Sequence, residues 1–143
     1  MENRVKILIA DGNEEFCGHL KRALEQSGGY EVVGIAGDGE QALALLSAQE
    51  PDVLVLDLLL AKIDGISILK QAHNMDKAPV ALVLSGFMTE FVGSMAVSLG
   101  VQYFMAKPCD FELVAERIRE IVAVERQSKS AAQKKGEVNI EAM

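Results

Sequence analysis

Several residue types that mark particular classes of protein are rare in this sequence. There is no tryptophan, aromatic residues make up 5% of the 143 positions, and there are only two cysteines and three prolines. Cys17 and Cys109 are far apart and belong to no Cys-x-x-Cys pair or Cys/His cluster, which argues against a zinc site and against a disulfide framework. We therefore expect the reducing environment of the cytoplasm.

Long apolar runs and positive charge are also scarce. No stretch approaches the roughly 18 apolar residues of a membrane-spanning helix, and the N-terminal apolar run is too short for a signal peptide. The chain has 14 Lys and Arg residues and 21 Asp and Glu residues, which gives a formal net charge of −7. Because an acidic surface repels phosphates, we expect this domain not to bind nucleic acid directly. The acidity fits either a solvated surface or a cation site.

Aliphatic side chains, in contrast, are abundant, and half of all residues are hydrophobic. Apolar runs alternate with segments of helical periodicity, which predicts an α/β domain with a parallel, doubly wound sheet of five strands. The predicted strands are Val5–Ala10, Tyr30–Ala36, Val53–Asp57, Val80–Ser85 and Val101–Ala106. The predicted helices run from Asn13 as N-cap to Gly28, over Gln41–Ala48, Ile66–Asn74 and Thr89–Leu99, and through Phe111 to Val122. We expect one domain over residues 1–126 and a flexible tail or linker over 127–143.

Four polar residues stand at the ends of four of these strands. They are Asp11, Asp57, Ser85 and Lys107, the last followed by Pro108. Each alone has an ordinary structural explanation, as a turn residue, a helix cap or a solvated lysine. In a parallel sheet, however, strand ends meet at one edge, so that two carboxylates, a hydroxyl and an ammonium should share one site. Such a site suits Mg²⁺ and the formation of an aspartyl phosphate.

The residues around this site resemble those of the response-regulator receiver family. VLVLDLLLAKIDG is similar to the family's stretch around its phosphoacceptor, GVQYFMAKP is similar to its fifth strand and Lys-Pro turn, and the resemblance covers residues 3 to 126. Within the family, the similarity is greatest to the receiver of the sporulation-initiation transcription factor of spore-forming bacteria. The resemblance implies a flavodoxin-like fold with strand order 2-1-3-4-5 and a role in two-component or phosphorelay signalling that controls transcription.

Carried over to this chain, the family's pattern gives roles to individual residues. Asp57 would accept the phosphoryl group from a histidine kinase or a histidine phosphotransferase, and Lys107 would pair with the phosphoryl oxygens. Ser85 would hydrogen-bond the phosphoryl group, and Phe104 would be the switch aromatic that packs inward when the hydroxyl moves. The domain would be a signalling switch and not an enzyme.

The metal site departs from the family's pattern. Resemblance assigns Mg²⁺ to Asp11, Asp57 and the backbone carbonyl of Leu59, but the second acid that usually ends the first strand is replaced by Gly12. Because the affinity of a site for a hard cation depends on its number of carboxylates, we expect weak Mg²⁺ binding. Because of Gly12, an alternative hypothesis stays open: the chain would be a degenerate receiver, which acts as a phosphorylation-independent binding or dimerisation module.

Two further properties follow from the resemblance. The fourth helix, fifth strand and fifth helix would form a homodimer surface that includes Phe91, Met95, Tyr103 and Arg117. Leu59 and Phe87 occupy the positions that influence hydrolysis in receivers; neither can hydrogen-bond an attacking water, so the aspartyl phosphate should be long-lived.

Two enzyme classes are the alternatives to this interpretation. A phosphatase with an aspartyl nucleophile would need a second Asp at position 59, which is Leu59. A flavin-binding protein would need a phosphate loop rich in Ser, Thr and Gly after the first strand, but the sequence there is ADGNEE, whose acids repel phosphate. Neither class fits these residues.

The replacement by Gly12 generates the first prediction. The change Gly12→Asp should tighten Mg²⁺ binding by roughly tenfold or more, because it adds a carboxylate to the cation site. Isothermal titration calorimetry measures the affinity, and Gly12→Asn serves as a control of similar shape without the charge. Equal Mg²⁺ affinity for the wild type and Gly12→Asp would show that the number of acids does not limit binding.

Overall fold

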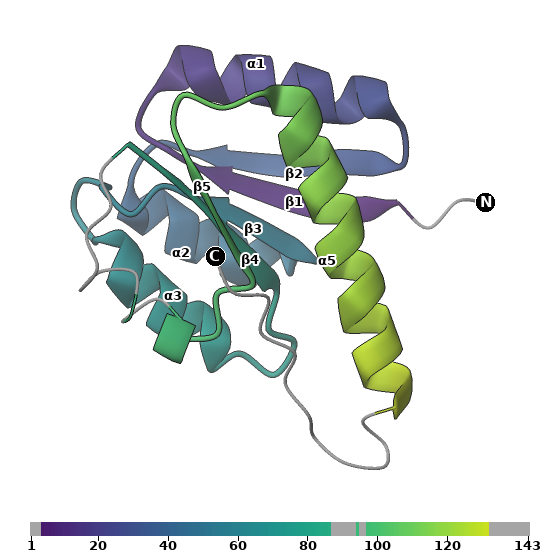
Figure 1. Ribbon diagram of the computed structural model, residues 1–143. Coiled ribbons are helices and arrows are strands. Elements are labelled where there is room, and N and C mark those ends of the chain that lie inside the picture. The colour runs from purple at the N-terminus through teal and green to yellow at the C-terminus, as the bar shows by residue number, and fades with distance from the viewer. Residues whose placement is uncertain (1–3, 87–93, 95–96, 132–143) are drawn as a thin grey trace.

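The computed structural model describes residues 4–86, 94 and 97–131, and it is built around one parallel sheet (Figure 1). The strands are β1 (Val5–Ala10), β2 (Tyr30–Ala36), β3 (Val53–Leu56), β4 (Val80–Ser85) and β5 (Tyr103–Ala106). They are ordered β2-β1-β3-β4-β5, and every neighbouring pair is parallel. The predicted architecture and strand order are confirmed.

Helices cover both faces of this sheet (Figure 1). On one face, buried residues of α1 (Glu14–Ser27) and α5 (Phe111–Ala131) share a hydrophobic cluster with the sheet. On the other face, α2 (Gly39–Gln49) and α3 (Gly65–His73) form a second cluster. The sheet is therefore doubly wound, and its central strands are covered on both sides.

This arrangement explains why the central strands show no polar alternation. In β1, Ile7 and Ile9 belong to the cluster under α1 and α5, whereas Leu8 and Ala10 belong to the cluster under α2 and α3. All four side chains are fully buried. A strand with two buried faces needs apolar residues at successive positions, and this produced the continuous runs in the sequence.

Most predicted strand ends and both predicted ends of α1 agree with the structure. Asn13 caps α1, because its side chain accepts a hydrogen bond from the backbone N–H of Phe16, and Gly28 ends the helix with a positive φ of 87°. β3 stops at Leu56, one residue before the predicted end, and β5 begins at Tyr103, two residues after the predicted start. Asp57 and Gln102 still donate one backbone hydrogen bond each to the neighbouring strand, at Ala10 and Ala81, but lie outside the regular pairing.

The last helix is longer than predicted. It continues to Ala131, past the domain boundary expected after residue 126, because Gln, Lys and Ala between 127 and 131 are good helix formers even without an apolar period. The boundary itself stays a prediction, and most of the helix predicted over Thr89–Leu99 lies outside the described residues. Among the described helices, none is long and apolar enough to cross a membrane.

Two glycines hold the loop between β3 and α3 in place. The backbone N–H of Gly65 donates to the carbonyl of Leu58, and that of Gly39 donates to the carbonyl of Ala61. A Cβ on Gly65 would lie 2.5 Å from Leu58 Cα, and one on Gly39 would lie 2.0 Å from the carbonyl oxygen of Ile63. Both contacts are too short for any side chain, so these positions require glycine.

This close approach generates the second prediction. Gly65→Ala should lower the free energy of unfolding by about 1–3 kcal/mol, because the new methyl group overlaps backbone that cannot move without shifting the loop. Gly18→Ala is the matched control, since Gly18 lies inside α1 and a Cβ there would meet nothing within 4 Å; it should raise stability by about 0.5–1 kcal/mol. Urea denaturation measures both. If the two alanines have the same effect, the Gly65 contact does not constrain the loop.

Candidate functional site

The strand ends bring the sequence-predicted residues to one edge of the sheet. Asp11 follows β1, Asp57 follows β3, Ser85 is the last residue of β4 and Lys107 follows β5. The backbone N–H of Asp57 donates to the carbonyl of Ala10 at 2.9 Å, and that of Lys107 donates to the carbonyl of Ser85 at 3.0 Å. These bonds extend the strand pairing by one residue, which places Asp57 beside the end of β1 and Lys107 beside the end of β4.

The ammonium of Lys107 lies between two carboxylates. Its Nζ donates to Asp11 Oδ2 and, at 2.9 Å, to Asp57 Oδ2. The side chains are largely withdrawn from water: 19% of Lys107, 13% of Asp57 and 5% of Asp11 is exposed. Burial lowers the pKa of Lys107, but the hydrogen bonds to Asp11 and Asp57 outweigh it and leave the pKa above its usual value. Lys107 therefore stays protonated and neutralises much of the negative charge at this edge.

Each carboxylate is also fixed by its own backbone. Asp11 Oδ1 accepts a hydrogen bond from the N–H of Asn13, and Asp57 Oδ1 accepts one from the N–H of Leu59, both at 2.9 Å. One oxygen of each acid thus orients the turn after its strand, while the other meets Lys107. The same two carboxylates therefore both stabilise a turn and pair with the ammonium.

Ser85 and Phe104 lie on the two neighbouring strands at this end of the sheet. Ser85 is 1% exposed. Phe104 pairs in register with Val83 on β4, and its partly buried ring packs against the cluster under α2 and α3. The structure places the two residues close to the Lys107 turn, and their switch roles stay predictions.

The oxygen donors at this edge fit a hard divalent cation. Asp11 and Asp57 supply two carboxylates on adjacent strands, and the carbonyl of Leu59 is the third predicted donor. Within the described ranges, no three His, Cys, Asp or Glu side chains gather closely enough to hold a metal ion. Gly12 leaves room for a third acid, because a Cβ there would meet only the carbonyl of Gly37 at 3.6 Å. These oxygen ligands therefore suit Mg²⁺ chemically, but they include only two negative charges.

One neighbour of the site was not identified as functional from the sequence. Phe16, expected only as part of the apolar face of the first helix, places its ring 4.2 Å from the Nζ of Lys107. The nearby Cys17 donates to the backbone carbonyl of Asp11, and burial raises the pKa of its thiol to about 11. Burial also raises the pKa of Cys109. Both thiols are thus poor nucleophiles.

Comparison with known proteins identifies the family of this chain. Residues 7–119 match the response regulator receiver domain family. The chain belongs to this family. Receiver domains accept phosphoryl groups from histidine kinases and generally bind Mg²⁺ at the phosphorylation site.

Solved structures of other receivers have the same fold. The signal receiver domain of a DNA-binding response regulator from Colwellia psychrerythraea 34H is 30% identical, with a TM-score of 0.75 over 83% of this chain and 98% of that chain. A two-component response regulator of the LuxR family from Aurantimonas sp. SI85-9A1 is 25% identical, with a TM-score of 0.77 over 85% of this chain and 86% of that one. A CheY-like receiver protein from Methanospirillum hungatei JF-1 has a TM-score of 0.81 over 87% of this chain and 98% of that chain; at 22% identity, it shows the fold alone.

Two expectations fall partly outside the described residues of this receiver. Phe87, Phe91 and Met95 are not described. Of the expected dimer surface, Tyr103 and Arg117 lie together, with the Arg117 guanidinium carbon 5.5 Å from the centre of the Tyr103 ring.

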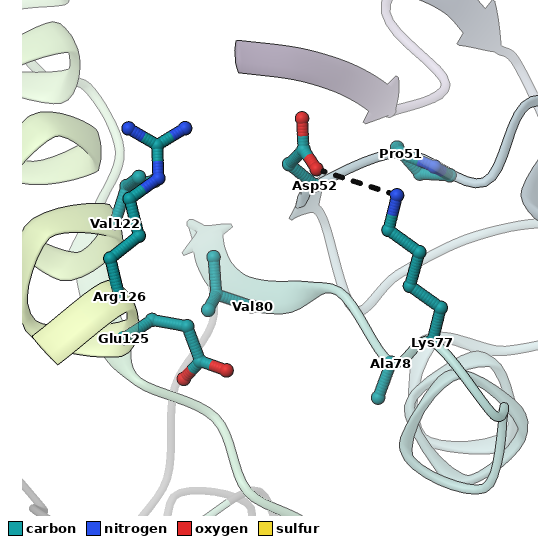
Figure 2. A pocket seen from close by; sticks show the side chains of 8 residues that line it. All are labelled: Pro51, Asp52, Lys77, Ala78, Val80, Val122, Glu125 and Arg126. Atoms are coloured by element: carbon teal, nitrogen blue, oxygen red, sulfur yellow. Dashed lines mark ion pairs between the residues drawn. The ribbon is translucent and has the colours of Figure 1, made fainter. Parts of the chain in front are cut away.

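A hollow of about 70 Å³ lies at the opposite end of the sheet, where β3 and β4 begin. Figure 2 shows Lys77 reaching toward Asp52 on one side and the side chains of α5 on the other. The Lys77 ammonium is 3.8 Å from Asp52, and 52% of the Lys77 side chain is exposed. This pair has the same chemistry as the Lys107 pairs but lies far closer to bulk water.

The two lysines generate the third prediction. Lys107→Ala should lower the free energy of unfolding by about 1–3 kcal/mol, because it leaves two partly buried carboxylates without a cation. Lys77→Ala, the matched control, should change it by no more than about 0.5 kcal/mol. Thermal unfolding with and without MgCl₂ should also show a larger Mg²⁺ stabilisation for Lys107→Ala than for the wild type, because the ion no longer competes with the ammonium. Equal losses for both lysines would contradict this account.

Proposed function

We propose that this domain is a phosphorylation switch of a cytoplasmic two-component or phosphorelay system, with Asp57 as the phosphoacceptor. The observation that carries the proposal is the contact of one protonated lysine, Lys107, with both Asp11 and Asp57 at the carboxyl edge of the sheet. An ammonium beside the acceptor carboxylate can hold the oxygens of an incoming phosphoryl group. The opposite end of the sheet has an Asp–Lys pair, Asp52 and Lys77, in which the ammonium meets one acid only among the described residues.

The proposed reaction is a phosphoryl transfer from the imidazole of a phosphohistidine donor. An oxygen of Asp57 forms a bond to phosphorus while the N–P bond of the donor breaks, and the electron pair of that bond returns to the imidazole nitrogen. The N–H of Leu59 holds Asp57 Oδ1, which leaves Oδ2 as the oxygen nearer to Lys107. A bound Mg²⁺, held by Asp11 and Asp57 with the carbonyl of Leu59, would neutralise charge on the phosphoryl oxygens.

The expected output of this switch is control of transcription. After phosphorylation, Ser85 would move to hydrogen-bond the phosphoryl group and Phe104 would pack further inward, which changes the surface formed by β5 and α5. Support comes from the similarity to receivers of DNA-binding and LuxR-family response regulators. Sporulation is the process that the resemblance of VLVLDLLLAKIDG and GVQYFMAKP favours. A homodimer through the surface that contains Tyr103 and Arg117 belongs to this proposal.

The phosphorylated state should persist for a long time. Leu59 is the one large hydrophobic residue with high exposure in the described part of the chain, at 65%. An apolar side chain at the open side of the acceptor cannot orient an attacking water, so hydrolysis lacks this source of acceleration.

Gly12 supports a second candidate function, a degenerate receiver that binds partners without phosphoryl transfer. With only two carboxylates and a resident ammonium, the edge keeps a net charge of one negative unit without any metal, which attracts a divalent cation only weakly. Such a domain would keep the fold and the Lys107 contacts but would bind Mg²⁺ too weakly for catalysis of its own phosphorylation.

The fourth prediction separates these functions. Incubation with acetyl phosphate and Mg²⁺ should add one phosphoryl group to the wild type, detected by intact mass spectrometry. Asp57→Asn should abolish the label, because an amide cannot act as the nucleophile. Asp52→Asn is the control, since Asp52 lies at the other end of β3, and it should be labelled like the wild type. Label retained by Asp57→Asn would refute the acceptor, and an unlabelled wild type would favour the degenerate receiver.

A further inference from the structure

An aromatic ring forms a third contact of the Lys107 ammonium. The Nζ lies 4.2 Å from the centre of the Phe16 ring, in addition to its hydrogen bonds with Asp11 and Asp57. Phe16 also packs in an edge-to-face arrangement with Phe111 at the start of α5, with ring centres 5.5 Å apart and planes inclined at 68°. The ammonium therefore meets two anions and the electron-rich face of a ring, an arrangement that attracts a cation.

The position of this ring is set by the site itself. Asp11 Oδ1 accepts from the N–H of Asn13, and Asn13 Oδ1 accepts from the N–H of Phe16 at 3.0 Å. The Phe16 ring then covers Lys107, which returns to Asp11 through its other oxygen. Asp11, Asn13, Phe16 and Lys107 thus form a closed ring of contacts. In this ring of contacts, the N-cap of α1 holds the aromatic ring over the ammonium.

The three contacts of the ammonium differ in how they respond to the proposed reaction. Phosphorylation changes the charge and the oxygens of Asp57, and a divalent cation would compete with Lys107 for Asp11. The Phe16 ring is neutral and remains the same in every state. Lysine has a flexible stem with four methylene groups, so an unchanging contact limits how far the ammonium moves when the others are exchanged.

We propose that Phe16 is a positioning residue for Lys107, which holds the ammonium at the acceptor when phosphorylation and metal binding replace its two carboxylate contacts. The effect of Phe16 on phosphoryl binding rests on the proposed function, whereas the position of the Phe16 ring over Lys107 does not. A purely structural role is the competing explanation, because Phe16 also packs against the cluster under α1 and α5.

The first measurement tests the placement in the metal-free, unphosphorylated protein. Protons above the face of an aromatic ring resonate upfield, so the ε-methylene protons of Lys107 should be shifted upfield in the wild type. Phe16→Leu should move them to ordinary lysine positions, and Phe16→Tyr, which keeps the ring, should leave them shifted. Unshifted Lys107 protons in the wild type would overturn the proposal at this step.

The second measurement tests the consequence, with beryllofluoride and Mg²⁺ as a mimic of the phosphoryl group. Phe16→Leu should weaken beryllofluoride binding several-fold, within the roughly 2- to 30-fold range that a cation–π contact accounts for. Phe16→Tyr should restore wild-type affinity. Ile121→Val, a buried change in the same cluster, controls for lost packing and should leave the affinity unchanged.

The outcomes separate the two proposals. A wild type that binds no beryllofluoride would refute the proposed function. A wild type that binds it, together with equal affinity in Phe16→Leu or a loss in Phe16→Tyr as large as in Phe16→Leu, would refute the role of Phe16 alone. A similar loss in Ile121→Val would assign the effect to packing.

Discussion

At the carboxyl edge of the sheet, the Lys107 ammonium allows two largely buried carboxylates to lie on adjacent strands. Asp11 and Asp57 would otherwise repel each other, with little water to screen them. The shared cation removes that repulsion and, because each acid uses its other oxygen to order a turn, fixes where β1 and β3 lead into the following segments. The turns after β1 and β3 and the chemistry of the edge thus involve the same two carboxylates and the same ammonium.

The loop after β3 is held from the other side. Gly65 and Gly39 approach it more closely than any side chain would allow, and Lys62 adopts a left-handed conformation with φ of 73° that is unfavourable outside glycine. The Lys62 ammonium lies 3.4 Å from Asp38 and 3.6 Å from Glu40 at the start of α2. The close glycine contacts constrain the backbone of this loop, which would suit a carboxylate that meets a donor in one orientation.

Much of the fold could be predicted because parallel strands buried on both faces leave continuous apolar runs, and because helix ends carry local signals such as Asn13 and Gly28. The end of β3 and the start of β5 were predicted less accurately, because strand pairing depends on residues far away in the sequence. The length of α5 was also missed, because its last residues, 127–131, are mostly polar and have no apolar period to mark them.

By itself, the sequence determined the alternation of five strands with helices. It also determined that Asp11, Asp57, Ser85 and Lys107 meet at one edge, since each residue directly follows or ends a recognisable strand. Only the tertiary structure decided that Lys107 contacts both acids and that Phe16 covers it. Phe16 and Lys107 are separated by most of the chain, and helical spacing shows that Phe16 faces inward without showing which side chain it meets. Such contacts arise from the packing of α1 beside the β5 turn, so no local pattern encodes them.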